Sequence, residues 1–480
     1  MFICSHCGAN VDNSSSSCRE CGAAVAAAAR TEEARPNASA IPDCRPATAV
    51  VDGDHLAAEV PHRGVAGADF ILKGESFAGE KAELPVNDNL LAGNMLLLGD
   101  SGTGKTGVFM QTLPQLRDRM SDEDVLLAFD RSGELFSRFS RPEKDVVFSS
   151  SPETADSGAD HWNIFREINA APDAEAAANA IADSLFLEKL RDTNPPFIAA
   201  AARDLFAAVL CFFPHIQGMA ANNLELRAFL DQVSPAQLRQ LVAQVPAFRG
   251  SAYSINDPES GKTLAVMSIL RRLAREVFSG DFKKIGFLSI RELVRDRGGK
   301  VVFIRHDPGQ GKVLAPVKRL LLDLAIHETL TRKRVEKGRV FFLLDDFHLL
   351  PALEHAGEGV CSARNSCVRF VVAVQNLEQL AAVYGKKKAR VIASGMGTVL
   401  TFRISDPDTR KYVQSRYGAN LKQMLRFSPA LNRGVAGSVH PGNVVEDCDL
   451  LNLGRGQAIV GLPAQRPFCF RFDNAPERQP

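Results

Sequence analysis

The 480-residue sequence has almost no excess of charge of either sign. It contains 57 lysine and arginine residues and 56 aspartate and glutamate residues, which leaves a formal net charge of +1. This balance excludes a globally basic protein that coats nucleic acid and a protein with an acidic tail, because both need a large excess of one sign. Any contact with a polyanion must therefore come from a local basic patch.

Long apolar runs are also missing. A membrane-spanning helix needs about 18 or more successive apolar residues, and the nearest candidate, residues 197–213, is interrupted by Arg203 and Asp204. The first residues contain neither the basic nor the apolar region of a secretory signal. We therefore expect a cytoplasmic protein without a membrane-spanning segment. In that reducing compartment, the 10 cysteines would not form a disulfide framework.

Four of the cysteines instead suggest a metal site near the start of the chain. They form two C-x-x-C pairs, Cys4 with Cys7 and Cys18 with Cys21. This spacing is typical of a tetrahedral structural Zn²⁺ site rather than of a redox pair or free thiols, and so small a unit could not fold without metal. We predict a zinc ribbon over residues 1–22, which would dock a protein rather than DNA because it contains few basic residues.

Changes in composition and periodicity divide the rest of the chain. Residues 23–64 are rich in alanine, proline and threonine, which favours a flexible linker. Further on, short apolar segments alternate with helical patterns, which is typical of a doubly wound, mainly parallel α/β sheet. Residues 171–280 carry only helical patterns. We therefore predict an α/β domain in two parts, residues 65–170 and 281–476, interrupted by an all-α insertion.

The predicted elements are short apolar strands and amphipathic helices. The strands cover residues 94–98, 125–129, 301–304, 340–344, 368–374 and 399–402. In the insertion, helices are predicted over residues 173–189, 194–213, 223–233, 234–245 and 262–278. Asn194 would cap the second of these helices, with Pro195 at its first position.

A phosphate-binding loop follows the first of these strands. Residues 99–106 fit the pattern G-x-x-x-x-G-K-[ST] and lead into a helix. Backbone N–H groups and the helix dipole would bind phosphates there. The predicted ATP-binding residues are Gly99, Asp100, Ser101, Gly102, Thr103, Gly104, Lys105 and Thr106. Lys105 would reach the β- and γ-phosphates and Thr106 would bind Mg²⁺.

A similar segment, Gly261-Lys262-Thr263, lacks both the leading glycine and a preceding strand. We therefore assign it to the start of a helix rather than to a second phosphate loop.

Two acidic residues, Asp345 and Asp346, follow the apolar strand 340–344. Ligands bind at the carboxyl ends of strands in open α/β sheets. We therefore predict that Asp345 holds Mg²⁺ and that Asp346 polarises the attacking water; the alternative is a capping pair for the next helix. Gln375, which follows the strand 368–374, is either a γ-phosphate sensor or a solvated turn residue.

The best candidate for DNA contact is the run Lys386-Lys387-Lys388, because it follows the strand that ends at the candidate sensor. Such a run is more often only a solvated helix face. No aromatic residues interleave with these lysines, so binding would be to phosphates and independent of base sequence.

Together these motifs resemble those of the ATPases of type IV secretion coupling proteins, the TraD/TraG-like conjugative DNA pumps related to the FtsK/HerA translocases. The resemblance covers residues 70–480 and rests on residues 99–106, 128–134, 162–165, 341–346 and 362–385. A chromosome- or repair-related translocase of the FtsK/HerA branch is disfavoured by the helical insertion and by Trp162.

The resemblance implies a RecA-like, homohexameric ring with nucleotide at the subunit interfaces. DNA, or DNA bound to a relaxase, would pass through its channel with the help of secretion-channel proteins. It also implies that Arg364 is an arginine finger rather than an ordinary surface arginine, the alternative that its polar loop leaves open, that Gln375 is the sensor and that Asp130 lies near the nucleotide. We therefore expect a translocase that hydrolyses ATP with Mg²⁺. The alternative is a slowly hydrolysing, ATP-gated recruitment protein that docks a partner through its zinc ribbon.

Three features depart from the family pattern. Asp345-Asp346 replaces the usual Asp-Glu, and Arg131-Ser132 replaces Pro-Lys. The cysteine-rich unit and linker stand where family members usually have transmembrane helices. We therefore expect any attachment to the inner face of the membrane to depend on a partner.

Overall fold

The computed structural model describes most of the chain. The described residues are 2–3, 10–11, 48–61, 64–149, 160–217, 221–306, 309, 311–331, 338–363, 366–426 and 436–473. The chain divides into two compact units, residues 1–42 and residues 43–480.

The described part of the first unit is a pair of short antiparallel strands, β1 (Phe2–Ile3) and β2 (Asn10–Val11). The four cysteines of the predicted zinc ribbon lie outside the described residues, as does most of the predicted linker. Within the described ranges, no group of three or more potential ligands could hold a metal ion. The zinc ribbon therefore stays a prediction from the sequence.

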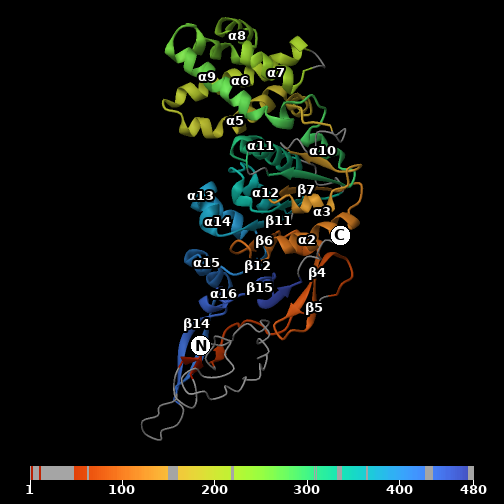
Figure 1. Ribbon diagram of the computed structural model, residues 1–480, viewed down its shortest axis with the longest axis vertical. Helices are drawn as coiled ribbons and strands as arrows, with labels where there is room; N and C mark the ends of the chain where they lie inside the picture. The colour runs from red at the N-terminus through yellow and green to blue at the C-terminus, as the bar shows by residue number, and fades with distance from the viewer. Residues whose placement is uncertain are drawn as a thin grey trace. The chain divides into compact units, whose positions relative to one another are not determined.

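An 11-stranded sheet runs through the second unit (Figure 1). The strand order is β5-β4-β16-β15-β12-β6-β11-β10-β7-β9-β8. From β12 to β8 all neighbouring strands are parallel. These strands are β12 (Thr398–Thr401), β6 (Met95–Leu98), β11 (Val368–Val374), β10 (Val340–Leu344), β7 (Val125–Asp130), β9 (Lys300–Arg305) and β8 (Val146–Phe148).

Antiparallel strands extend the other side of this sheet. They are β15 (Gln457–Gly461), β16 (Phe468–Phe472), β4 (Ala68–Ser76) and β5 (Lys81–Asn87). A separate antiparallel sheet contains β14 (Ala436–Asn443), β13 (Ala419–Arg426) and β3 (Thr48–Asp52). The mainly parallel α/β fold is thus confirmed, and all six predicted strands belong to its parallel part. The short edge strand β8 and the antiparallel strands were not predicted.

The parallel strands are buried because helices cover them. Helix α2 (Lys105–Arg119) contributes Val108 and Phe109 to the same apolar core as Leu97 and Phe341 of the strands. The other helices of the α/β part are α1 (Asp88–Leu91), α3 (Glu134–Phe139), α4 (Ile164–Asn169), α10 (Ile290–Asp296), α11 (Gly311–Leu330), α12 (Ala356–Ser362), α13 (Leu377–Tyr384), α14 (Lys386–Ser394), α15 (Pro407–Tyr417) and α16 (Asp447–Leu451). Short 3-10 helices η4 (Gly280–Lys283) and η5 (Phe347–Leu349) lie between them.

A cluster of helices interrupts the sheet in sequence (Figure 1). It contains α5 (Ala174–Asp192), α6 (Pro196–Gln217), α7 (Asn223–Gln232), α8 (Pro235–Val242), the 3-10 helix η3 (Pro246–Ile255) and α9 (Gly261–Val277). No strand occurs in the described residues of this stretch. Ser260 caps α9 by accepting from the N–H of Thr263, so the second Gly-Lys-Thr segment is a helix start, as predicted. The prediction of Pro195 as the first residue of α6 is wrong, because the helix begins at Pro196.

Helix α6 is long and apolar enough to cross a membrane by length and composition. Such a helix is weak evidence of a membrane span, because the core helix of a soluble protein passes the same test. Residues Leu205, Phe206 and Leu210 are fully buried. Its charged residues Arg203 and Asp204 bond to each other, and Arg203 also bonds to Asp183 of α5. Burial among the neighbouring helices thus accounts for the apolar composition of α6.

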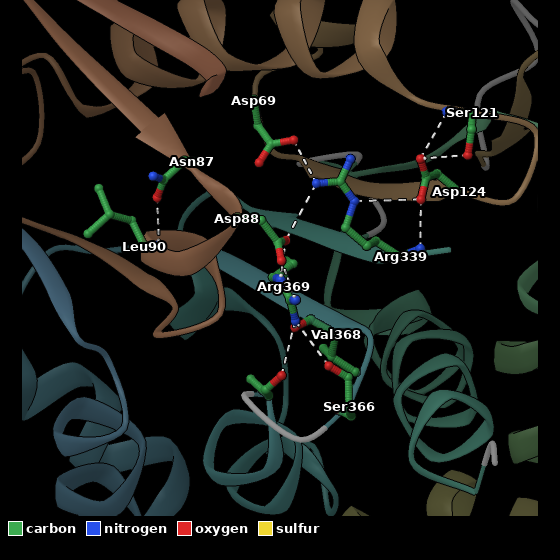
Figure 2. A network of polar contacts seen from close by, with 11 residues as sticks. Asp69, Asn87, Asp88, Leu90, Ser121, Asp124, Arg339, Ser366, Val368 and Arg369 are labelled. Carbon is green, nitrogen blue, oxygen red and sulfur yellow. Dashed lines mark hydrogen bonds and ion pairs between the residues drawn. The ribbon is translucent and has the colours of Figure 1, made fainter. Parts of the chain in front are cut away.

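The amino ends of the parallel strands are joined by a network of ion pairs (Figure 2). Arg339, which precedes β10, contacts Asp69 of β4 at 2.6 Å, and its backbone N–H donates to Asp124, which precedes β7. Arg369 of β11 holds both carboxylate oxygens of Asp88 at 2.9 and 3.0 Å. Hydrogen bonds from Arg369 lower the pKa of Asp88. The charged side chains at this edge of the sheet therefore pair with one another and stabilise the fold.

A buried glutamate joins the two segments that flank the helical insertion in sequence, one before α5 and one after α9. Glu167 of α4 is fully buried and accepts four hydrogen bonds. The donors are the indole of Trp162 at 2.9 Å, the hydroxyl of Ser289 at 2.8 Å, and the N–H groups of Ile290 at 2.6 Å and Arg291 at 3.2 Å. Burial raises the pKa of Glu167, and these four donors oppose the shift. The carboxylate thus caps α10 and ties it to α4.

Replacing Glu167 with glutamine should destabilise this junction. The amide NH₂ would face a backbone N–H donor, so the Glu167→Gln variant should lose about 1–3 kcal/mol of unfolding free energy in denaturant titration. Glu292→Gln is the matched control, since Glu292 lies on α10 beside this junction and its side chain is 31% exposed in its pair with Arg166. That variant should lose less than about 1 kcal/mol. Equal losses would contradict the assigned role of Glu167.

Candidate functional site

The loop between β6 and α2 is held in a conformation that requires glycine. Gly102 and Gly104 have φ angles of 75° and 115°, in the left-handed region that L side chains rarely adopt. A Cβ atom on Gly104 would also lie 3.0 Å from the Cα of Gly456, which precedes β15. The backbone of the loop therefore closes against a second glycine-containing turn, and α2 begins directly after it.

Lys105 is the first residue of α2 and is only 6% exposed. Its ammonium group donates to the carbonyl oxygens of Gly99 at 2.6 Å and Asp100 at 2.9 Å. Burial lowers its pKa, and the nearby Asp346 and Asp345 oppose this shift. The ammonium group thus lies inside the loop, where it can reach an anion that the loop encloses.

Asp345 meets the loop although its strand is not adjacent to β6. Strand β11 lies between β6 and β10, but all three are parallel, so their carboxyl ends share one edge of the sheet. The hydroxyl of Thr106 lies 3.4 Å from a carboxylate oxygen of Asp345. Burial, followed by the charge of Asp346, raises the pKa of Asp345 to about 6.

This pair of groups fits Mg²⁺. A hydroxyl and a carboxylate oxygen are ligands that Mg²⁺ accepts, usually together with phosphate oxygens and water. Asp345 and Asp346 are 4% and 7% exposed, and adjacent buried carboxylates are costly unless a cation is near. Thr106 and Asp345 would therefore hold the ion.

Asp346 has a left-handed backbone with φ of 48°, which ends the extended conformation of β10. One carboxylate oxygen accepts from the guanidinium of Arg131 at 2.5 Å. The other lies 3.5 Å from the amide nitrogen of Gln375 and 4.0 Å from Nδ1 of His348. Gln375 thus lies beside the second acid, at the end of β11.

A pocket of about 600 Å³ opens between these elements. Several predicted residues line it, namely Ser101, Gly102, Gly104, Lys105, Thr106, Asp345 and Asp346. Gly99, Asp100, Thr103, Asp130 and Gln375 do not line it. The carboxylate of Asp100 instead accepts from Ser405, and buried Asp130 accepts from the N–H groups of Gly133 and Phe136. Asp130 therefore shapes the turn before α3 rather than facing the pocket.

The pocket also contains charged residues that the sequence reasoning missed. They are Arg131, Glu134, Arg138, Arg455 and Asp473. Arg131 was noted only as a departure from the family pattern, yet it contacts Asp346. Only the strand pairing reveals its place, because Arg131 lies two residues beyond Phe129, which lies opposite Leu344 in the pairing between β7 and β10. Arg455 follows a glycine and precedes Gly456, which contacts the phosphate loop.

The remaining predicted residues lie elsewhere. Arg364 lies outside the described residues. Lys386, Lys387 and Lys388 form the first turn of α14, are exposed, and do not line the pocket.

Comparison with known proteins identifies the family. Residues 79–437 match the family model of the type IV secretion-system coupling protein DNA-binding domain. This chain belongs to that coupling protein family. Among curated relatives, VirD4 of Rhizobium rhizogenes is 23% identical over 380 residues, which cover 75% of this chain and 55% of the relative. VirD4 of Agrobacterium fabrum is 23% identical over 340 residues, covering 67% and 49%. The chain thus spans about half the length of these relatives.

Solved structures of coupling proteins share the fold. The unbound conjugative coupling protein TrwBdeltaN70 has a TM-score of 0.66 and 20% identity, covering 87% of this chain and 91% of that one. TrwB in complex with ADP and Mg²⁺ has a TM-score of 0.63 and 19% identity, covering 81% and 87%. VirB4 of Thermoanaerobacter pseudethanolicus is more distant, with a TM-score of 0.51 and 15% identity, covering 85% and 98%.

Proposed function

We propose that this coupling-protein family member hydrolyses ATP with Mg²⁺ to drive the transfer of DNA or nucleoprotein. The observation that carries the proposal is the meeting of Lys105, Thr106 and Asp345 in one pocket. A P-loop lysine, a metal-binding hydroxyl and an acid at a neighbouring strand end are the parts that phosphoryl transfer requires. TrwB, which shares the fold, has been solved with ADP and Mg²⁺ and with ADPNP.

Each residue then has a distinct role in hydrolysis. Lys105 would leave its two carbonyl partners to neutralise the β- and γ-phosphates, while the loop N–H groups hold the phosphate oxygens. Mg²⁺, when bound by Thr106 and Asp345, would supply further neutralisation of phosphate charge. Asp346 would polarise the attacking water and Gln375 would orient it. The water oxygen would bond to the γ-phosphorus while the bond from that phosphorus to the bridging oxygen breaks. The bridging oxygen leaves with ADP, and the protons of the water pass to inorganic phosphate and solvent.

The lysine run at the start of α14 supports the proposal that the protein binds the phosphates of DNA. Positive charge is unfavourable at a helix N-terminus, where the macrodipole is positive. Lys386, Lys387 and Lys388 are exposed there, and among the described residues no ion pair with a carboxylate relieves them. Their placement does nothing for the stability of the helix, so binding to phosphates is the better explanation.

Further parts of the proposal rest on the family resemblance and on the sequence. The chain would act as a homohexamer in which Arg364 is offered to the neighbouring subunit as an arginine finger. It would work at the inner face of the membrane with secretion-channel proteins and a relaxase. A Zn²⁺ ion held by Cys4, Cys7, Cys18 and Cys21 would order a docking ribbon. The strands β1 and β2 support this, since they flank the first cysteine pair in sequence.

Steady-state ATP turnover, measured with and without DNA, tests the motor function. The wild type should be stimulated by DNA, and Lys105→Ala should lower turnover at least about 100-fold, because the variant has no ammonium group to bind phosphate in a water-poor site. Lys262→Ala is the matched control, since Lys262 belongs to the second Gly-Lys-Thr segment and starts α9. That variant should keep its turnover. Low turnover that DNA does not change would instead favour the ATP-gated recruitment protein.

Replacing Lys386, Lys387 and Lys388 with glutamine should separate DNA binding from folding. DNA affinity should fall, and the slope of log affinity against log salt should decrease by roughly 1 for each lysine that binds a phosphate in the wild type. The thermal midpoint should stay the same or rise, because three charges that oppose the helix dipole are removed. ATP turnover without DNA should not change. An unaltered salt slope would show that these lysines do not contact DNA.

A further inference from the structure

Arg131 holds a position that the family pattern does not provide, and an inference about it rests on the proposed ATP hydrolysis. Strands β7 and β10 are parallel neighbours in which Phe129 lies opposite Leu344. Two residues further along, Arg131 and Asp346 emerge side by side at the carboxyl edge. Here the guanidinium donates to Asp346 at 2.5 Å. The strand register therefore places a cation directly beside the acid assigned to the attacking water.

Asp346 is enclosed on both sides by the ends of its neighbouring strands. Arg131 follows β7 and bonds one carboxylate oxygen, while Gln375 follows β11 and lies 3.5 Å from the other. With a guanidinium bonded to one oxygen and an amide nitrogen beside the other, the carboxylate has little room left to accept a hydrogen bond from water. In this arrangement Asp346 is poorly disposed to polarise water.

The Arg131 side chain can leave this position. It is 44% exposed, whereas the side chain of Asp346 is 9% exposed, so the arginine sits on the open side of the pair. Arg131 also lines the pocket that contains Lys105 and Thr106. Water reaches the arginine end of the pair, so the guanidinium stays solvated when it moves away from Asp346. The guanidinium can therefore exchange one anionic partner for another without unfolding its surroundings.

The charge balance of the pocket supports such an exchange. The cationic lining residues are Lys105, Arg131, Arg138 and Arg455. The acidic ones are Glu134, Asp345, Asp346 and Asp473. Among the described lining residues, positive and negative side chains are equal in number, so these residues offer a triphosphate no net positive charge. A guanidinium can bind two phosphate oxygens at once, which makes a phosphate a better partner than the single carboxylate oxygen.

We propose that Arg131 is a ligand of the terminal phosphate of a nucleoside triphosphate. Before the triphosphate binds, the guanidinium is paired with Asp346. When the γ-phosphate takes the guanidinium, the carboxylate of Asp346 is released and can accept a hydrogen bond from water. A nucleoside diphosphate, which lacks that phosphate, leaves the Arg131–Asp346 pair intact. Arg131 thus couples recognition of the third phosphate to the availability of Asp346.

The test compares nucleotide binding and turnover in Arg131→Met. The affinity for a non-hydrolysable ATP analogue should fall about tenfold, since a charge-assisted hydrogen bond is removed, while that for ADP changes less than about threefold. KM for ATP should rise, and kcat at saturating ATP should equal or exceed that of the wild type because Asp346 is no longer held. For Arg131→Lys, the affinity for the ATP analogue and KM for ATP should lie between those of the wild type and those of Arg131→Met, since lysine keeps the charge but not the planar fork.

Arg141→Met is the matched control, because Arg141 is 51% exposed in a surface pair with Asp118 and does not line the pocket. This variant should leave the affinity for the ATP analogue, the affinity for ADP, KM and kcat unchanged.

Three results would overturn the proposal. A loss of kcat without a change in KM would make Arg131 a group that acts only in the transition state. Equal losses for ADP and the ATP analogue would make it a general structural or electrostatic element. Unchanged binding and turnover would show that it does not touch the nucleotide. Failure of the proposed function itself would be distinct, since the wild type would then show no ATP turnover.

Discussion

The common direction of strands β6, β11, β10 and β7 is the constraint on which the candidate site depends. Because these neighbours are parallel, every one of them ends at the same edge, and the first polar residue beyond each apolar run emerges there. Thr106 and Asp345, which are far apart in the sequence, meet for this reason. Reversing any of these strands would send its functional residue to the opposite edge.

The two edges of the sheet use charge differently. At the amino edge, Arg339 and Arg369 are bound tightly by Asp69, Asp88 and Asp124, which joins strands and α1 into one framework (Figure 2). At the carboxyl edge, the charged groups are arranged around a pocket. There the ammonium group of Lys105 donates to backbone carbonyls and Arg131 is partly exposed. A rigid amino edge thus supports a carboxyl edge whose groups can change partners.

The parallel strands other than β8, and the phosphate loop, could be predicted from sequence because their signals are local: short apolar runs, a glycine-rich pattern and acids at a strand end. The strands β13 and β14 were missed because polar residues are spread along them and neither contains an apolar run. By contrast, β15 and β16 carry apolar segments from which these two strands could have been predicted. The contact between Arg131 and Asp346 depends on which strands are neighbours. Sequence spacing does not state that order, so the role of Arg131 required the structure.

The central claim is that the phosphate loop and Asp345 form one site for a nucleotide and its metal. Its most direct test is the Mg²⁺ dependence of binding of a non-hydrolysable ATP analogue, measured by titration calorimetry in the wild type and in Asp345→Asn. The account predicts that Mg²⁺ strengthens wild-type binding by about tenfold or more and that the variant loses most of this gain while it still binds the metal-free nucleotide. Full Mg²⁺ dependence in the variant would contradict the account.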